Sequence, residues 1–409
     1  MSVHYRKFEI EAAPTTEAGD VNVTIVMPCL NEIQSLSHCI GNALDALARL
    51  RSEHGMSGEI VVADNGSTDG SQALATELGA RVVPVYQRGY GAALIGGCHA
   101  AGGRYILMGD CDGSYDFVEG VAMIAKLAEG YDVCMGSRFK GGISRGAMPW
   151  KNRYIGNPAL TGILNLFFRS GISDAHCGLR AICKDAFTRL KLTSTGMEFA
   201  SEMVVKAALL KLKMAELPAT LSHDLREREP HLRPWRDGWR HLRYLFMLSP
   251  TWLFGVPAVA ALFVACMLLT GSGIQYVKPG SVRFIGDYWT ILGGAAFSVG
   301  DLCFMMMLAG QIYALKAGYR RPTKLIGVCR KVLTLETMLV SGLSFIALGL
   351  AILAVVGLQW VERHFTPAPS VFMPVVGTLC ITIGVQTALG GFLMAIISGN
   401  EANFLLDCE

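Results

Sequence analysis

The sequence has little of three features that would place it in common classes of protein. Its twelve cysteines form no C-x-x-C pair and have no His-x-x-x-His companion, so neither a zinc site nor a disulfide framework is predicted, and we expect reduced thiols in a core. A net charge of +3 and the lack of a dense basic stripe in the first half argue against a nucleic-acid-binding protein. Residues 1–20 contain no apolar run typical of a signal peptide, so we expect the N-terminal region to stay in the cytoplasm.

Charge is also scarce after residue 250. Residues 251–270 contain no charged side chain, and about 20 apolar residues in a helix span a hydrocarbon core of about 30 Å. Residues 289–315, 336–358 and 371–397 are similar, with Asp301 interrupting the first of these three. We predict a membrane region of four transmembrane helices over residues 251–397 and a cytoplasmic tail at 398–409. Asp301 is expected to face a neighbouring helix and a polar partner there.

Basic residues are distributed unevenly over the loops between these helices. The loop between the second and third contains Lys316, Arg320, Arg321, Lys324, Arg330 and Lys331, whereas the other two contain only Lys278, Arg283 and Arg363. The positive-inside rule then predicts that the richer loop and everything before residue 250 are cytoplasmic. The segment 231–250 interleaves tryptophan and tyrosine with arginine, which indicates a juxtamembrane amphipathic helix in the headgroup layer; a solvated basic linker is the alternative.

Residues 21–230 alternate short β-rich runs with helical stretches. The runs VNVTIVMP, EIVVADNGS, ARVVPVY and YILMGDCD are separated by sequences typical of helices. This alternation predicts an α/β domain with a parallel sheet covered by helices on both faces. Ligands of such sheets bind at the carboxyl ends of the strands, and each polar cluster of this region begins where a strand is predicted to end.

The strongest local signal is the pair Asp110 and Asp112 after the strand YILMG. Two carboxylates at a strand end can bind a hard divalent cation such as Mg²⁺ or Mn²⁺, which neutralises a nucleotide diphosphate. An Asp-rich turn has the same pattern, so the pair alone leaves both interpretations open. The string ADNGSTDGS follows another strand; helix capping explains Ser67–Asp69 but not Asp64 and Asn65.

Six strings in this order, MPCLNE, ADNGSTDGS, QRGYGAAL, GDCDGSYDF, GSRFKGG and DAHCGLRAI, resemble the family-2 glycosyltransferases. Within that family they are similar to the branch of dolichol-phosphate mannose synthase and the polyprenyl-phosphate glycosyltransferases. The resemblance implies a GT-A fold (Rossmann-like, nucleotide-sugar-binding), a divalent metal and inversion at the anomeric carbon.

The resemblance also implies roles for individual residues on the donor side. Nucleotide-binding positions are matched by Pro28, Asn31, Glu32, Asp64 and Asn65, the last standing where many members have Asp. Asp110 and Asp112 match the positions that hold the sugar diphosphate and metal, and Ser114 stands where a third metal ligand is often Gln. The spacing of QRGYGAALIGG is not that of a dinucleotide fingerprint, so Arg88, Gly89 and Gly91 are interpreted as donor-site backbone, with a structural turn as the alternative.

On the acceptor side, cations are needed because a lipid phosphate must approach an anionic donor. Arg138, Arg153 and Asn157 match the positions by which this branch binds the acceptor phosphate, and an arginine with an amide at i+4 suits that group. Arg226, Arg228 and Arg233 are expected to close over the diphosphate. Asp174, Cys177, Arg180, Glu198 and Glu202 also match family positions, with roles that can be structural.

The predicted reaction transfers one sugar from a nucleoside-diphosphate-sugar, UDP-glucose first and GDP-mannose second, to a polyprenyl phosphate such as undecaprenyl or dolichyl phosphate. One rival is a processive polysaccharide synthase, although the Gln-x-x-Arg-Trp motif of those enzymes does not occur. Another is a lipid flippase or transporter with a regulatory α/β domain, which Asp301 would favour. A homo-oligomer is compatible with the sequence.

Overall fold

The computed structural model describes residues 21–226, 234–282, 284–320, 333–366 and 370–404. The chain divides into two compact units, Met1–Leu245 and Phe246–Glu409. The ten cysteines in the described ranges are all unpaired, and six of them are buried, as expected for reduced core thiols.

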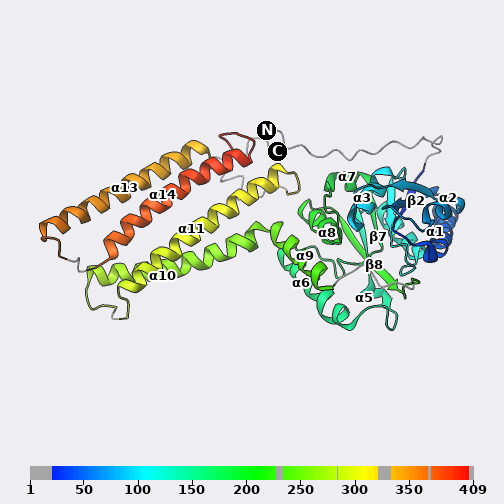
Figure 1. Ribbon diagram of the computed structural model, residues 1–409, viewed down its shortest axis with the longest axis horizontal. Coiled ribbons are helices and arrows are strands. Elements are labelled where there is room, and N and C mark those ends of the chain that lie inside the picture. Colours follow the sequence, from blue (N-terminus) through cyan, green and yellow to red (C-terminus); the bar gives the residue numbers. More distant parts are fainter. Residues whose placement is uncertain (1–20, 227–233, 283, 321–332, 367–369, 405–409) are drawn as a thin grey trace. The chain divides into compact units, whose positions relative to one another are not determined.

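The first unit is built around an eight-stranded sheet with the order β3-β2-β1-β4-β7-β5-β8-β6 (Figure 1). The strands are β1 (Val23–Cys29), β2 (Gly58–Asp64), β3 (Arg81–Pro84), β4 (Tyr105–Met108), β5 (Val133–Ser137), β6 (Gly142–Ile143), β7 (Arg180–Cys183) and β8 (Met214–Leu221). The strands β1 to β4 pair in parallel, as the alternating pattern predicts.

One strand departs from the expected parallel sheet. The strand β7 lies antiparallel between β4 and β5, and its first residue, Arg180, pairs with Met108 and Met135 near the carboxyl ends of both. The chain leaves β5 at this edge and returns to it before β7 begins, so β7 enters the sheet in the opposite direction. The sheet is therefore mixed.

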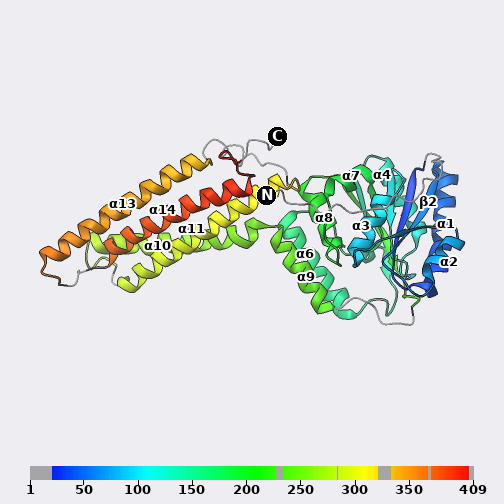
Figure 2. The same cartoon turned by 45° about the horizontal axis from the view of Figure 1, so that its top comes forward.

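Helices cover both faces of the sheet (Figures 1 and 2). They are α1 (Ile33–His54), α2 (Ser71–Glu77), α3 (Tyr90–Ala100), α4 (Gly120–Ala128), α5 (Arg138–Gly141), α6 (Asn157–Phe168), α7 (Lys184–Leu190) and α8 (Phe199–Leu209), with short turns η1 (Phe117–Glu119) and η2 (Asn152–Gly156). Ile25 and Met27 of β1 belong to one buried cluster with α1 and α4. Val26 faces the other way, where a Cβ on Gly97 of α3 would lie 2.6 Å from it. Burial on both faces explains the continuous apolar run of β1.

The helix α9 (Pro234–Met247) lies within the segment predicted to be amphipathic. Asp237, His241 and Leu245, spaced four residues apart, are buried, whereas Trp235 and Trp239 are exposed. His241 Nδ1 lies 2.7 Å from Ser201 Oγ of α8, so the buried face of α9 packs against the α/β unit. Its other face retains the exposed tryptophans that an interfacial helix needs.

The second unit contains four helices that are long and apolar enough to span a membrane, at Thr251–Val277, Asp287–Lys316, Leu335–Glu362 and Phe372–Ile397. They correspond to η3 (Thr251–Gly255) with α10 (Val256–Val277), and to α11 (Asp287–Lys316), α13 (Leu335–Glu362) and α14 (Phe372–Ile397) (Figure 1). Each coincides with a predicted transmembrane helix.

Asp301 lies in α11, one of the four long apolar helices. Its Oδ2 atom is buried and makes no hydrogen bond with any described residue, and the same holds for Gln386 Oε1 of α14. Each residue lies one helical turn before the place where Met305 of α11 approaches Gly390 of α14. The expected polar partner of Asp301 stays a prediction.

Glycines allow α13 and α14 to pack closely. A Cβ on Gly384 would lie 2.5 Å from the carbonyl oxygen of Gly342, and one on Gly349 would lie 2.6 Å from that of Gly377. Small residues spaced along facing helices let backbones approach in this way, and van der Waals packing then holds the helices together.

We predict that Gly384→Ala destabilises the membrane unit, because the added methyl group would force α13 and α14 apart. Overpacking of this kind costs about 1–3 kcal/mol. The unfolding midpoint in detergent should fall accordingly. Gly357→Ala is the matched control, since a Cβ there has no neighbour within 4 Å among the described residues. Equal midpoints for the two variants would contradict the close packing.

Candidate active site

Asp110 and Asp112 follow β4 and differ in how their oxygens are used. Asp110 Oδ1 accepts a hydrogen bond from the Tyr90 hydroxyl at 2.9 Å. Asp112 Oδ1 accepts one from the backbone N–H of Ser114 at 2.9 Å, which fixes the turn. The second oxygen of Asp112 lies 2.8 Å from Arg226 Nη2. Asp112 therefore presents one oxygen to a cation.

The two carboxyl groups also interact electrostatically. Burial, and next the negative charge of Asp112, raise the pKa of Asp110 to about 6. Both effects penalise the ionised form of Asp110. A cation beside the pair would reverse this penalty, because it favours the charged form of both groups.

Arg226 joins three carboxylates at this site. Its Nη1 lies 3.1 Å from Glu32 Oε1, its Nη2 contacts Asp112, and its Nε lies 2.7 Å from Asp224 Oδ2. Burial alone would lower the pKa of Arg226, but hydrogen bonding to Asp224 and the charges of Asp112 and Glu32 raise it above its ordinary value. The cation that the carboxylates require is thus provided by the chain itself.

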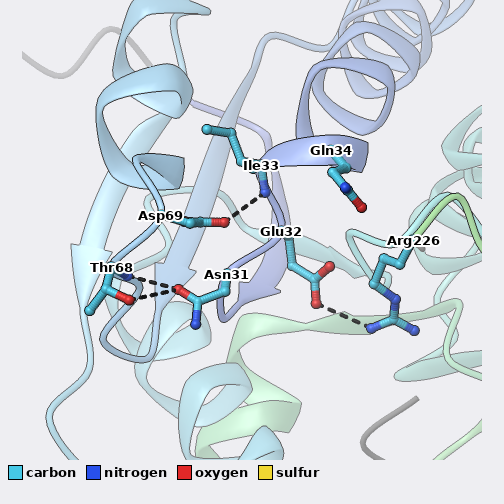
Figure 3. Close-up of a pocket in the computed structure, with 7 residues that line it drawn as sticks. All are labelled: Asn31, Glu32, Ile33, Gln34, Thr68, Asp69 and Arg226. Carbon is cyan, nitrogen blue, oxygen red and sulfur yellow. Dashed lines mark hydrogen bonds and ion pairs between the residues drawn. The ribbon is translucent and has the colours of Figure 1, made fainter. Parts of the chain in front are cut away.

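Glu32 and Arg226 line a cavity of about 590 Å³, drawn in Figure 3. The other residues that line it are Asn31, Ile33, Gln34, Thr68 and Asp69. Asn31 has a left-handed backbone (φ 59°), and its Oδ1 accepts a hydrogen bond from Thr68 N at 2.7 Å. Asp69 Oδ2 accepts one from Ile33 N at 3.1 Å, at the first turn of α1. The loop after β2 therefore caps the helix that follows β1.

Asp64 and Asn65 organise two loops. Asp64 Oδ2 accepts hydrogen bonds from Gly66 N at 2.9 Å and from Gln72 Nε2 at 2.6 Å. Asn65 Nδ2 donates to the carbonyl oxygens of Val85 and Gln87 at 2.9 and 2.7 Å, and its Oδ1 accepts from Gly89 N at 2.8 Å. An amide can donate and accept in this way and a carboxylate cannot, so these bonds require asparagine and not aspartate at residue 65.

The glycines of QRGYG pack against backbone. Gly89 has φ 135°, and a Cβ there would collide with Thr195 O; one on Gly91 would collide with Ser194 O. These contacts account for both glycines without a ligand. Arg88 Nη1 donates to Asn65 O at 2.9 Å, and Pro28 O accepts from Cys111 Sγ at 2.8 Å.

Arg138 is almost fully occupied by one partner. Its Nε and Nη2 atoms each lie 2.7 Å from an oxygen of Asp174, and the residue is only 7% exposed. This bidentate pair is strong and directional. Arg138 Nη1 makes no hydrogen bond within the described residues, so it is the one part of the guanidinium that remains for an anion.

Arg153 and Asn157 lie on η2 and at the start of α6, one turn apart and partly exposed. The guanidinium of Arg153 lies over the Tyr154 ring at 5.4 Å, and Asn157 Nδ2 contacts Met148 Sδ. Neither side chain contacts Asp110 or Asp112 in the described structure. Arg228 and Arg233 lie outside the described residues.

Several site residues were not predicted from the sequence, or only with an open role. Tyr90 donates to Asp110, and Asp224 accepts from Arg226. No spacing in the sequence identifies Tyr90 or Asp224 as a site residue. Arg180 is buried with Nε and Nη1 lacking partners among the described residues. Glu202 is structural: it pairs with Lys206 at 2.7 Å and accepts from Ser194 N at 2.7 Å.

No group of three or more His, Cys, Asp or Glu residues in the described ranges is arranged to hold a metal. The Arg226 guanidinium lies beside Asp112 and Glu32 in the place of a metal ion. These two carboxylates therefore accept a cation. A divalent ion that keeps water and phosphate ligands needs only one or two protein carboxylates. The hydroxyl of Ser114 makes no hydrogen bond to Asp112, which contacts only the Ser114 backbone.

The chain matches two family models. Residues 24–190 match glycosyl transferase family 2, and residues 308–398 match the glycosyltransferase family 2 C-terminal transmembrane region. The second match supports a membrane protein.

Known proteins resemble the chain over much of its length. The low-salt glycan biosynthesis hexosyltransferase Agl6 of Haloferax volcanii is 35% identical over 91% of this chain and 88% of its own. A dolichyl-phosphate hexose transferase of the same organism is 27% identical over 54% of this chain and 92% of its own. A solved glucosyl-3-phosphoglycerate synthase from Mycobacterium tuberculosis, in complex with Mn²⁺ and UDP, aligns over 56% of this chain and 78% of its own, with TM-score 0.41 and 19% identity.

The predicted fold class is confirmed: an α/β sheet domain of GT-A type precedes a helical region with four candidate membrane spans. The relative that matches nearly the whole chain and the two family models agree on one family. The chain belongs to glycosyltransferase family 2.

Proposed function

We propose that this enzyme transfers one sugar from a nucleoside-diphosphate-sugar to a polyprenyl phosphate, with inversion, to give a glycosyl-phosphoryl-polyprenol. The observation that carries the proposal is the cluster of Asp112, Arg226 and Glu32 at the carboxyl ends of β4 and β1. Carboxylates with an exchangeable cation suit a diphosphate leaving group, and they occur here in a chain with four candidate membrane spans.

The relatives support this reaction class. One is named a hexosyltransferase, and the other a dolichyl-phosphate hexose transferase. We extend both names to this chain: the donor is a hexose nucleotide, with UDP-glucose favoured over GDP-mannose, and the acceptor is a polyprenyl phosphate such as dolichyl or undecaprenyl phosphate. The α/β unit then works at the cytoplasmic face, where nucleotide-sugars are available.

The donor would occupy the cavity lined by Asn31, Glu32 and Arg226. Asp64 and Asn65 fix the two loops described above, and Arg88 is bonded to the first of them. Pro28 is bonded instead to Cys111 of the turn after β4. The glycines Gly89 and Gly91 let the backbone of 194–196 approach. The diphosphate would lie toward Asp112, where the guanidinium of Arg226 already faces a negative charge.

A divalent ion, Mg²⁺ or Mn²⁺, would be held by Asp112 and assisted by Asp110. When bound it neutralises charge on the leaving diphosphate. Tyr90 fixes Asp110 by a hydrogen bond, so this carboxylate cannot turn away from the site. Ser114 fixes Asp112 through its backbone N–H.

The acceptor phosphate would be bound by Arg153 and Asn157 on one helical face, with Arg138 Nη1 available to a third oxygen. A phosphate monoester is largely ionised near neutral pH, so its oxygen can attack the anomeric carbon without a general base. Catalysis then consists of positioning and electrostatic stabilisation.

We predict that Asp112→Asn abolishes transfer while the protein stays folded, because the change removes a charge at the surface of the site and no core contact. Activity would be assayed with Mg²⁺ or Mn²⁺, and folding by thermal unfolding. Asp45→Asn, at an exposed position of α1, is the control and should be fully active. Normal turnover in Asp112→Asn, or full wild-type activity in excess chelator, would disprove the metal role.

Arg153→Ala should raise the KM for the lipid phosphate far more than the KM for the sugar nucleotide. A charge-assisted hydrogen bond in a partly buried site contributes about 1.5–3 kcal/mol, or roughly ten- to a hundred-fold. Lys151→Ala, an exposed cation on the preceding turn, should change neither constant. Equal damage to both constants would place Arg153 in the scaffold or on the donor side.

The nucleotide product tests the reaction itself. Cleavage on the sugar side of the diphosphate releases a nucleoside diphosphate, whereas transfer of a phosphosugar releases a nucleoside monophosphate. We expect UDP or GDP and a β-linked sugar from an α-linked donor. Chromatography of the products in the absence of phosphatase measures this, and UMP or GMP as the primary product would rule the mechanism out.

A further inference from the structure

We propose that Arg226 occupies the position of the divalent cation in the free enzyme, so that the metal binds poorly alone and enters together with the nucleotide diphosphate. The inference rests on the proposed function for the identity of the diphosphate, but its first part concerns only the metal. It makes Arg226 a group that moves from carboxylates to phosphate when the donor binds.

The contacts of Asp112 place the two cations in competition for one carboxylate. One oxygen is held by Ser114 N, and the other lies 2.8 Å from Arg226 Nη2. A Mg²⁺ ion binds its oxygens at about 2.0–2.1 Å, so an ion on the side of the second oxygen that faces Arg226 would overlap the guanidinium. The same guanidinium lies 3.1 Å from Glu32 Oε1. A metal that binds Asp112 from this side displaces Nη2 from Asp112, and because the guanidinium is one rigid plane, Nη1 moves with it away from Glu32.

The backbone before Arg226 is fixed on the turn that carries Asp112. Ser222 N donates to Ser114 O, and Leu225 N donates to Asp112 O, each at 2.9 Å. The Leu225 side chain lies over Gly113, where a Cβ would meet it at 2.6 Å. These contacts hold the start of the Arg226 side chain beside Asp112. The exchange therefore requires a movement of the guanidinium and leaves the residues 222–225 in place.

The charge of Arg226 determines which ligand can displace its guanidinium from Asp112. The side chains of Arg226 and Asp112 are only 13% and 14% exposed. A metal alone would leave the displaced guanidinium with fewer partners in this partly buried place, and an unpaired buried charge is costly. A diphosphate provides new oxygens for the guanidinium at the moment the metal takes the carboxylate. Asp224 stays beside Nε in both states and keeps the side chain near the site.

The test measures Mn²⁺ and nucleotide binding separately, without acceptor or turnover. In Arg226→Gln, the affinity for Mn²⁺ alone should rise by at least about ten-fold, because a charge-assisted pair no longer competes for Asp112. The affinity for UDP or GDP at saturating Mn²⁺ should fall by a similar factor. Electron paramagnetic resonance of free Mn²⁺ and calorimetric titration of the nucleotide measure the two constants. A higher affinity for Mn²⁺ together with a lower affinity for the nucleotide distinguishes this exchange from simple damage to the site, which would lower both affinities.

Two further variants act as controls. Arg189→Gln removes an exposed arginine from an ion pair with Asp132 and should change neither constant. Arg226→Lys keeps a charge that can pair with one carboxylate at a time, so its Mn²⁺ affinity should lie between those of wild type and Arg226→Gln. Because Arg226→Gln removes a positive charge that Asp112 and Asp224 share, Mn²⁺ should raise its thermal unfolding midpoint more than that of wild type.

The outcomes separate this inference from the proposed reaction. Unchanged or weaker Mn²⁺ binding in Arg226→Gln would overturn the competition, as would the absence of Mn²⁺ binding in every variant. Unchanged nucleotide binding would overturn the transfer of Arg226 to the diphosphate. A tighter Mn²⁺ site in a protein that releases a nucleoside monophosphate, or that does not use a lipid acceptor, would uphold the competition and reject the proposed reaction.

Discussion

The pairing of β1 with β2 on one side and β4 on the other determines where Asn31, Asp64 and Asp110 lie. Its register aligns Cys29 with Asp64 and Val26 with Met108, so three strands end at one edge of the sheet. The β1 strand is buried on both faces, and a slip by two residues would separate the polar loops by about 7 Å. The apolar packing that holds β1 in this register therefore also sets the geometry of the site.

This edge concentrates negative charge, and the chain compensates for it with long-range cations. Arg226 reaches Asp112 across 114 residues of sequence, and Arg138 reaches Asp174 across 36. One arginine is shared among three carboxylates, Glu32, Asp112 and Asp224, while the other is fixed in a buried bidentate pair. The first arrangement can be rearranged by an anion, whereas the second has only one guanidinium nitrogen left to offer.

The sequence predicted the features that depend on local pattern. Alternating strands and helices, the four spans and the D-x-D turn all follow from residues near one another in the chain, and the structure contains them. The antiparallel entry of β7, the hydrogen bonds of Asn65 and the contacts of Arg226 depend on which distant segments meet. No spacing identifies Tyr90 as the partner of Asp110, because the hydroxyl reaches it only after α3 has packed beside β1. The roles of Arg153 and Asn157 remain proposals for the same reason: nothing in their own segment defines the partner they meet.

The three hydrogen bonds of Asn65 make two loops a single unit. Its amide donates to Val85 and Gln87 and accepts from Gly89, so the loop after β2 and the loop after β3 share their conformation. An aspartate in this position would set a carboxylate against two carbonyl oxygens. Because the three partners of Asn65 are backbone atoms, side chains of the second loop can vary, but an exchanged loop would have to keep its backbone conformation beside Asn65.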